Sequence, residues 1–421
     1  MVDLLIIADD FTGALDTGVQ FTQRGAATCV VTGPKIAYEK LDDDLRVLSL
    51  DAETRHLSPE LAYHTVAGIV RGARAHGVKY IYKKTDSALR GNIGAELAAL
   101  YDMTGRTVHF VPAFPRMNRV VQNGVLYIDG VPVGESVFGR DPFEPVCSSD
   151  IKDIITKQTD KKIFKIEDLQ HARDLERSEI YLYDAKSVDD MNAIGDELYE
   201  NGNLNVCAGC AGMAYVLAGK LGFNGSARSV KGLALPEKLL IACGSVNPIT
   251  VAQLKRAQEK GYSRMLLSTA QKFDKEWLDS AAASECIGRW KRLCEETGVC
   301  IIDSNDPDES KATLDYAGEH QISLDDLRTG IANVMAGIVK KLLDDRLDAT
   351  LLITGGDTLL GFMQAIGADM LRPICELVPG IVLSATEYLG KTYYVISKSG
   401  GFGEETLVED LVRILNRKER R

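Results

Sequence analysis

The sequence is short of the features that mark membrane and nucleic-acid-binding proteins. No apolar run approaches the ~18 consecutive residues that a membrane-spanning helix needs, and no basic segment precedes the first apolar run, so we expect neither a membrane protein nor a signal peptide. Lysine and arginine number 49 against 60 aspartates and glutamates, and the net charge of −11 argues against a nucleic-acid-binding protein. That charge is compatible with a local basic site for an anionic small molecule.

Cysteine is present, but not in the pattern of a disulfide-stabilised protein. There are nine cysteines, an odd number, and several lie in apolar runs typical of buried strands, such as Cys29, Cys243 and Cys300. This pattern favours reduced thiols and a cytoplasmic location. Cys207 and Cys210 have the spacing of a redox or metal motif, but a structural zinc site needs about four ligands and the sequence has no second such pair. We interpret both as small core residues at a strand-to-helix corner.

Most of the common catalytic and nucleotide-binding motifs are absent as well. The sequence contains no HExxH, no GxSxG, no Walker A loop and no GxGxxG. Its six histidines are scattered, and we expect His109 to be a hydrogen-bonded strand residue rather than a catalyst. No set of residues is predicted to bind a metal by itself. The missing nicotinamide fingerprint disfavours a hydroxyacid dehydrogenase in particular.

What the sequence does contain is a repeated order of apolar strand, turn and amphipathic helix. One example is the helix expected over residues 58–77, with Ser58 as N-cap, Pro59 at the first position and Gly77 as the stop. Asp129-Gly130 predicts a two-residue hairpin turn. A stretch of weak periodicity near residues 225–237 suggests a boundary between domains at 1–230 and 237–421. We therefore predict an α/β protein of two three-layer α/β domains with largely parallel sheets.

The strand-to-helix corners of the first half carry charged residues instead of glycines. The strand predicted at residues 4–8 leads directly into Asp9 and Asp10, where a phosphate-binding corner would have glycines. Arg55 follows another strand, and a third strand runs into a corner with Lys84, Thr85, Asp86, Ser87 and Arg90. Each has an ordinary alternative, such as a helix cap for Asp10 or a surface salt bridge for Arg55. Together they suit a small molecule with hydroxyl groups at one end and an acid at the other, which is a sugar acid.

The second half has the glycine-rich corners that the first half lacks. They are Gly244 with Ser245, Gly355 with Gly356, and the run that holds Gly400, Gly401 and Gly403. A glycine corner at the start of a helix exposes backbone N–H groups and places the positive end of the helix dipole beside an anion. A single such corner is weak evidence, but three in one domain favour a phosphate-binding site.

These motifs, in this order and over nearly the whole chain, resemble the four-carbon acid sugar kinase family. The resemblance rests on IADDFTGALD, KKTDSALRGNIG, PAFPRMNRVVQNGVLYIDGVPV, FGRDP, GSVNPITVAQ, TGGDT and SKSGGFG. It implies an N-terminal sugar-acid domain, a C-terminal nucleotide domain, and transfer of phosphate from ATP with Mg²⁺ to the terminal hydroxyl of a four-carbon acid. The implied substrate positions are Asp9 or Asp10, Arg55 and the run Lys84, Thr85, Asp86, Ser87, beside Arg90. The implied ATP positions are Ser245, the run Gly355, Gly356, Asp357, Thr358, and Gly400 or Gly401.

The resemblance leaves several points open. The KKTDS corner is more similar to threonate and erythronate kinases than to 3-oxo-tetronate kinases, so we expect D-threonate or D-erythronate as substrate. A 3-oxo-tetronate kinase and a non-catalytic sugar-acid sensor are the alternatives. Asp86 and Asp357 are both candidates for the catalytic base, and the family often has Glu where this chain has Asp357. Stereochemistry and oligomeric state, including a homodimer, are not fixed by the sequence.

Overall fold

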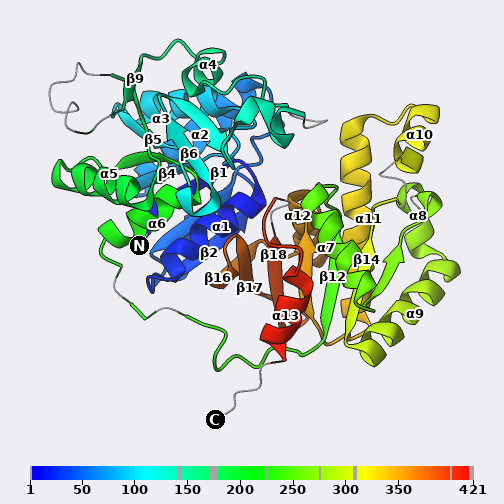
Figure 1. Cartoon of the computed structure of the whole chain (residues 1–421). Coiled ribbons are helices and arrows are strands. Elements are labelled where there is room, and N and C mark those ends of the chain that lie inside the picture. Colours follow the sequence, from blue (N-terminus) through cyan, green and yellow to red (C-terminus); the bar gives the residue numbers. More distant parts are fainter. Residues whose placement is uncertain are drawn as a thin grey trace. The chain divides into compact units, whose positions relative to one another are not determined.

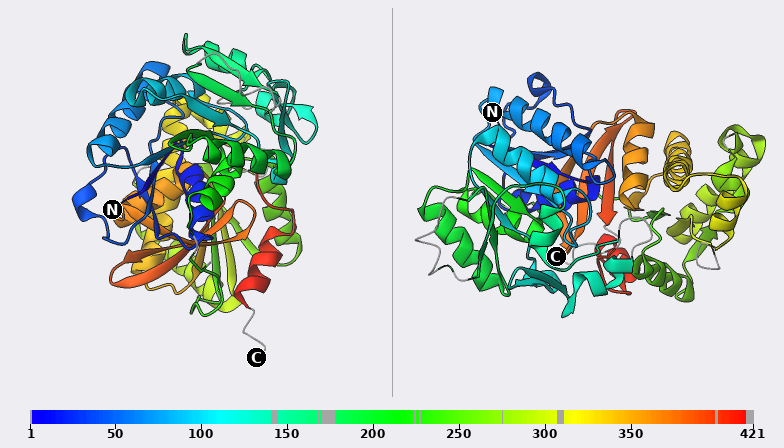
Figure 2. Two further views of the ribbon diagram at one scale, coloured as in Figure 1. Left: turned by 90° about the vertical axis from the view of Figure 1, so that its left-hand side faces the viewer. Right: turned by 90° about the horizontal axis from the view of Figure 1, so that it is seen from above.

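This computed structural model describes residues 2–140, 145–167, 169, 178–223, 225–226, 228–274, 276–306, 311–398 and 401–416. The chain divides into two compact units, Met1–Arg228 and Ser229–Arg421. Figures 1 and 2 show that each unit combines a β-sheet with helices, so the predicted α/β class is confirmed.

The main sheet of the first unit is parallel throughout. Its strands have the order β2-β3-β1-β4-β11-β5-β10-β9. Their bounds are β1 Leu4–Ala8, β2 Thr28–Thr32, β3 Val47–Asp51, β4 Tyr80–Lys84, β5 Val108–Val111, β9 Ile163–Ile166, β10 Ile180–Tyr183 and β11 Val206–Gly209. The central strand β1 is buried along its whole length, as expected for an apolar run that is covered on both faces.

Helices cover both faces of this sheet. They are α1 Phe11–Thr22, α2 Pro59–Ala75, α3 Ile93–Thr104, α4 Ile151–Thr156, α5 Val188–Glu200 and α6 Ala211–Lys220. α6 packs against α1 and α5, whereas α3 packs against α2 and α4 (Figure 1). α2 begins as predicted, because the Ser58 side chain accepts a hydrogen bond from the Leu61 N–H and Pro59 is its first residue. It also ends where predicted, since Gly77 follows its C-cap with a φ of 74°.

A small antiparallel sheet of β6 (Arg119–Gln122), β7 (Val125–Ile128) and β8 (Val131–Pro132) follows β5. The predicted hairpin is confirmed between β7 and β8. Asp129 and Gly130 have φ values of 50° and 80°, which is the conformation of a type I′ turn.

The second unit has a parallel sheet that becomes antiparallel at one end. Its order is β13-β14-β12-β15-β18-β17-β16, and the two pairs formed by β17 are antiparallel. The bounds are β12 Leu239–Cys243, β13 Ser263–Leu266, β14 Val299–Asp303, β15 Thr350–Thr354, β16 Met370–Val378, β17 Ile381–Tyr388 and β18 Lys391–Lys398. The long antiparallel strands β16 and β17 were not predicted from the sequence.

The helices of the second unit are α7 Pro248–Glu259, α8 Thr269–Phe273, α9 Ala281–Thr297, α10 Lys311–Glu319, α11 Leu324–Asp344, α12 Gly356–Ile366 and α13 Leu407–Leu415. α13 packs against α7, and α11 packs against α12, α9 and α8 (Figure 1). Short 3₁₀ turns complete the described chain at Tyr38–Lys40, Pro115–Met117, Val133–Glu135, Val137–Arg140 and Trp277–Asp279.

Cys207, Cys210 and His109 all lie in the core of the first unit. Cys207 and Cys210 are buried, and the Cys210 thiol donates to the carbonyl oxygens of Pro112 and Ala113, each at 3.3 Å. His109 is hydrogen-bonded through Nδ1 to the Tyr183 hydroxyl at 2.8 Å, and burial lowers its pKa to about 4. These contacts give all three residues a structural role. No helix within the described ranges has the length and apolarity to cross a membrane.

Candidate active site

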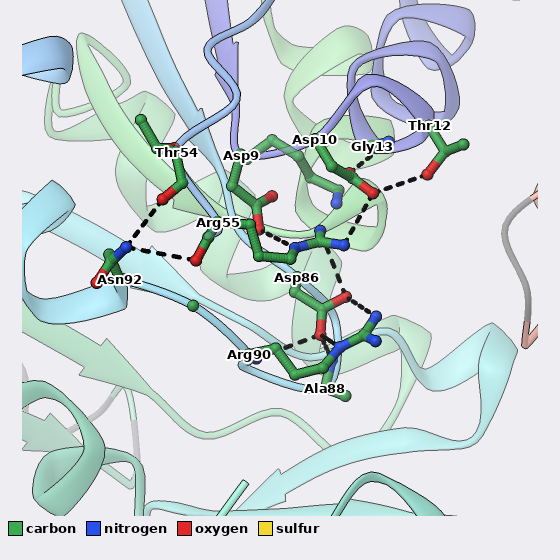
Figure 3. Close-up of polar contacts among 12 residues, drawn as sticks. Asp9, Asp10, Thr12, Gly13, Thr54, Arg55, Asp86, Ala88, Arg90 and Asn92 are labelled. Carbon is green, nitrogen blue, oxygen red and sulfur yellow. Dashed lines mark hydrogen bonds and ion pairs between the residues drawn. The ribbon is translucent and has the colours of Figure 1, made fainter. Parts of the chain in front are cut away.

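The charged corners of the first unit meet at one edge of its sheet. Asp9 and Asp10 follow β1, Arg55 lies four residues after β3, and Asp86 lies two residues after β4. β1 is flanked by β3 and β4, all three strands are parallel, and their carboxyl ends therefore share an edge. Figure 3 shows the side chains converging from these three corners.

Arg55 lies at the centre of this cluster and contacts three carboxylates. Its Nε is 2.8 Å from Asp9 Oδ2, its Nη1 is 2.9 Å from Asp10 Oδ2, and its Nη2 is 3.7 Å from Asp86 Oδ1 (Figure 3). The Arg55 side chain is only 10% exposed, so the alternative of a surface salt bridge is wrong. Burial alone would lower the pKa of Arg55, but the three carboxylates hold it well above the usual value. The guanidinium group is therefore a permanent charge that fixes the three carboxylates.

Asp86 is also held by Arg90 from its own loop. Asp86 Oδ2 accepts hydrogen bonds from Arg90 Nε at 2.8 Å and from the backbone N–H groups of Ala88 at 3.3 Å and Arg90 at 3.2 Å. Burial would raise the pKa of Asp86, but the charges of Arg90 and Arg55 hold it well below its usual value. Asp86 is therefore ionised and rigidly oriented. Ser87 follows Asp86 in the same loop and is also buried.

Asp10 combines a structural and an electrostatic role. Its Oδ1 accepts the Gly13 N–H at 2.8 Å and thereby caps α1, as the ordinary alternative predicts. Its Oδ2 accepts from Arg55 and from the Thr12 hydroxyl, the latter at 2.9 Å. Burial would raise the pKa of Asp10, but Arg55 and Lys84 lower it.

The two consecutive lysines at the end of β4 point to opposite faces of the sheet, as the alternation of a strand requires. Lys83 pairs with Glu96 of α3 at 3.0 Å, and both side chains are 0% exposed. Lys83 is therefore a buried structural residue. Lys84 lies on the α1 side: a Cβ added to Gly13 would stand 2.8 Å from Lys84 Nζ and 2.5 Å from Asp10 Oδ1. Gly13 thus leaves the space that the ammonium group occupies.

Several buried polar groups in this cluster are left without a protein partner. Within the described ranges, Asp9 Oδ1 and the Thr85 hydroxyl have no hydrogen-bond partner. Lys84 Nζ lies in the same cluster, where Asp16, Asp9, Asp10 and Asp86 raise its pKa against the opposing effect of burial. A buried polar group without a partner costs about 1–3 kcal/mol. Unpaired donors and acceptors in one cluster are therefore typical of a site that a polar ligand completes.

The glycine corners of the second unit also lie on adjacent strands. β12, β15 and β18 are neighbours in the sheet and parallel to one another. Gly355 has a φ of +97°, and a Cβ there would stand 3.4 Å from both the carbonyl carbon of Gly244 and the backbone nitrogen of Ser245. The first two corners are therefore in contact, and only glycine allows it.

The other predicted residues of this edge have well-defined places. Gly356 is the first residue of α12, Thr358 is buried in the same turn, and Ser245 precedes the N-cap of α7 by two residues. Asp357 forms an ion pair with Arg328 of α11 and is 41% exposed. Gly401 lies in the turn after β18, whereas Gly400 lies outside the described residues.

The structure adds residues that the sequence did not single out. Asn92 donates from Nδ2 to the carbonyl oxygen of Thr54 at 2.8 Å (Figure 3). It also donates to that of Leu57 at 2.8 Å, and so holds the loop that carries Arg55. Arg328 neutralises Asp357, and Lys398 ends β18 with a buried side chain. Only Lys398 had a signal in the sequence, because it is a lysine at the end of an apolar strand directly before a glycine corner.

Two family models match the chain. Residues 4–217 match a family described as a sugar-binding N-terminal domain, and residues 240–408 match one described as a nucleotide-binding C-terminal domain.

The chain also has curated relatives that match along almost its full length. It is 27% identical to a D-threonate kinase of Salmonella typhimurium over 425 residues, which cover 97% of each chain. It is 27% identical to a D-erythronate kinase of Heliobacterium modesticaldum over 417 residues, which cover 90% of this chain and 89% of the relative. A 3-oxo-tetronate kinase of Brucella melitensis is 23% identical over 434 residues, with 98% and 96% covered.

Two crystal structures share the fold. A protein of Salmonella typhimurium LT2 has a TM-score of 0.79 at 18% identity and covers 99% of this chain and 100% of its own. A Haemophilus influenzae protein has a TM-score of 0.70 at 18% identity, with 98% and 99% covered. These structures confirm the architecture described above.

Proposed function

Because the chain belongs to the four-carbon acid sugar kinase family, we propose that it transfers the γ-phosphoryl group of ATP to the 4-hydroxyl of D-threonate or D-erythronate. The observation that carries this proposal is the cluster around Arg55. It holds carboxylates and cations side by side, and it includes buried polar groups without a protein partner. A short polyhydroxy acid supplies hydroxyl donors for the former and a carboxylate for the latter.

The acid's carboxylate is best matched by Lys84. Arg55 already contacts Asp9, Asp10 and Asp86, so a ligand carboxylate would have to displace one of them. The Lys84 ammonium group is buried in the same cluster, and in this proposal it pairs with the carboxylate of the ligand. In this arrangement Arg55 positions the carboxylates, and the Asp9 Oδ1 atom accepts a substrate hydroxyl. Thr85 and Ser87, in the loop after β4, supply further hydroxyl groups, and Arg90 supplies a second cation.

Asp86 suits the orientation of the acceptor hydroxyl better than early removal of its proton. A general base works best when its pKa lies near the working pH, and the pKa of Asp86 is held well below that range. Phosphoryl transfer asks little of a base, because its transition state is loose and the main demands are alignment and charge neutralisation. Asp86 therefore acts in this proposal as a fixed hydrogen-bond acceptor for the 4-hydroxyl.

The nucleotide is assigned to the glycine corners of the second unit. Backbone N–H groups at the start of α7 and α12, near Ser245, Gly355, Gly356 and Thr358, would hold its phosphates, together with Gly401. Bound Mg²⁺ would neutralise phosphate charge, and the Asp357 carboxylate in the first turn of α12 fits as its protein ligand. The ion pair with Arg328 would hold the Asp357 carboxylate in place for that role.

The test is a coupled assay for ADP with purified protein and a panel of four-carbon acids. We expect turnover with D-threonate or D-erythronate and little with their enantiomers. Faster turnover of 3-oxo-tetronate would move the protein to that branch of the family. Absence of ADP formation with every acid, together with calorimetric binding of an acid, would favour the sensor instead. A Lys84→Met variant provides the control, because it should lose turnover through the KM for the acid and not through the KM for ATP.

A further inference from the structure

The end of β18 carries a buried lysine that the proposal above does not use. Lys398 is the last residue of this strand, and it is 1% exposed. It pairs in register with Thr354 at the end of β15, and Thr354 pairs with Cys243 at the end of β12. Lys398 therefore stands in the same row as the residues from which the two glycine corners begin.

The Lys398 side chain reaches the start of α7. Its Nζ donates a hydrogen bond to the Thr250 hydroxyl at 2.7 Å, and the Ser245 hydroxyl lies 3.5 Å from the same oxygen. One hydroxyl group thus joins the ammonium group to the Ser245 corner. Thr250 lies in the first turn of α7, whose N-cap Asn247 accepts the Ile249 N–H.

The segment after β18 is fastened to the same helix. Gln253 of α7 donates from Nε2 to the carbonyl oxygens of Phe402, Gly403 and Glu404 at 3.1, 2.8 and 3.0 Å. The Gln253 side chain is buried, so these bonds are shielded from water. Lys398 and the start of α7 are therefore held as one rigid arrangement, and the glycine corner after β15 touches it through Ser245.

The electrostatic character of this arrangement is positive. Burial lowers the pKa of Lys398 to about 8. The Cys243 thiol at the end of β12 opposes this effect only weakly, because its own pKa is raised to about 12 and it stays neutral. The positive ends of the α7 and α12 dipoles add to the lysine charge. A multivalent anion bound here would relieve the cost of burying the ammonium group.

We propose that Lys398 is a nucleotide-binding residue that donates to a phosphate oxygen of ATP and ADP in place of the Thr250 hydroxyl. This inference rests on the proposed function, in which the second unit binds ATP. It assigns to a side chain the charge neutralisation that backbone N–H groups supply only in part. The alternative is that Lys398 serves only to hold Thr250.

The first test compares Lys398→Met with Thr250→Val by calorimetric titration of ATP, ADP and adenosine. Lys398→Met should weaken ATP and ADP at least tenfold, as expected for loss of a charge-assisted hydrogen bond, and should leave adenosine unchanged. Thr250→Val removes the hydroxyl and keeps the charge, so it should weaken ATP much less. Equal losses in both variants, or a nucleotide affinity that Lys398→Met leaves unchanged, would overturn the proposal. Retained binding of adenosine shows that the second unit of each variant is folded.

The second test needs no variant to fold. Burial lowers the pKa of Lys398 to about 8, and a phosphate beside it favours the charged form, so nucleotide binding near pH 8 should take up protons. Titrations of ADP in two buffers of different ionisation enthalpy measure this uptake. Uptake near zero in the native protein would refute the role of Lys398 and leave the kinase assignment intact. Failure of the native protein to bind any nucleotide would instead remove the proposed function, and this inference with it.

Discussion

Lys83 and Lys84 are adjacent in sequence and both buried. We expect replacement of Lys83 to lower the stability of the protein, and replacement of Lys84 to weaken binding of the acid. Lys83→Met leaves the Glu96 carboxylate buried without its 3.0 Å partner. Loss of one member of a buried ion pair costs about 3–5 kcal/mol. At about 2–4 °C per kcal/mol for a unit of this size, the Tm of the first unit should fall by about 6–20 °C.

Lys84→Met should instead affect the acid substrate. The lost ammonium group would have formed a charge-assisted hydrogen bond of about 1.5–3 kcal/mol with the acid, which corresponds to a 10- to 150-fold rise in its KM. The KM for ATP should not change. Stability should fall less than in Lys83→Met, because Arg55 still neutralises Asp9, Asp10 and Asp86 near Lys84.

The assay combines thermal unfolding with steady-state kinetics on both variants and on the double variant Lys83→Met/Glu96→Gln. The neutral amide that replaces the Glu96 carboxylate removes the unpaired buried charge, so the double variant should recover at least half of the lost Tm. Similar losses of Tm in the two single variants would refute the division into a structural and a binding lysine. So would a Lys83→Met protein that keeps its Tm and loses affinity for the acid.

Three further outcomes are expected. Gly355→Val should weaken ATP binding at least tenfold and leave acid binding intact. Residue 355 has a φ of +97°, and an added Cβ would lie 3.4 Å from the Ser245 backbone nitrogen, so a valine side chain would strain this corner. Unchanged ATP affinity in calorimetry would place the nucleotide elsewhere. Asp10→Asn should keep the cap of α1 and cost less Tm than Asp10→Ala, yet lower kcat/KM for the acid by roughly 30-fold through its weaker bond to Arg55; full activity would contradict a role at the site. Burial would raise the pKa of Asp86, but its arginine neighbours hold it well below 3.8. The stability that ionised Asp86 contributes is therefore present above about pH 4 and is lost as the pH falls further. Asp86→Asn should make the free energy of unfolding less dependent on pH in this acid range, and an unchanged pH dependence would count against the prediction.

Local signals in the sequence account for much of the fold. The cap at Ser58 and the Asp129-Gly130 turn were predicted because each depends on a few neighbouring residues whose conformational preferences are strong. The strands β16 and β17 were missed because their stability comes from pairing with each other and with β18, which is a property of residues far along the chain.

The candidate site shows the same division. Polar residues at the ends of strands were visible in the sequence, and parallel topology brings Asp9, Arg55 and Asp86 to one edge. Strand order was not visible, so nothing in the sequence indicated that Arg55 contacts three carboxylates. Alternation placed Lys83 and Lys84 on opposite faces, but only the helix opposite each lysine decides which of them faces the cluster.

The neutralised state of the Arg55 cluster has a consequence for selectivity. Asp9, Asp10 and Asp86 act as internal counter-ions, so the cations of the site are not surplus charge waiting for any anion. In the proposed function, a ligand with one carboxylate and several hydroxyl groups would pair its carboxylate with Lys84 and donate its hydroxyl protons to the aspartates. A four-carbon diacid would bring a second negative charge against those aspartates, where like charges repel and no proton is offered. If the cluster binds the acid as proposed, it would distinguish an acid that still has its terminal alcohol from one in which that alcohol has already been oxidised.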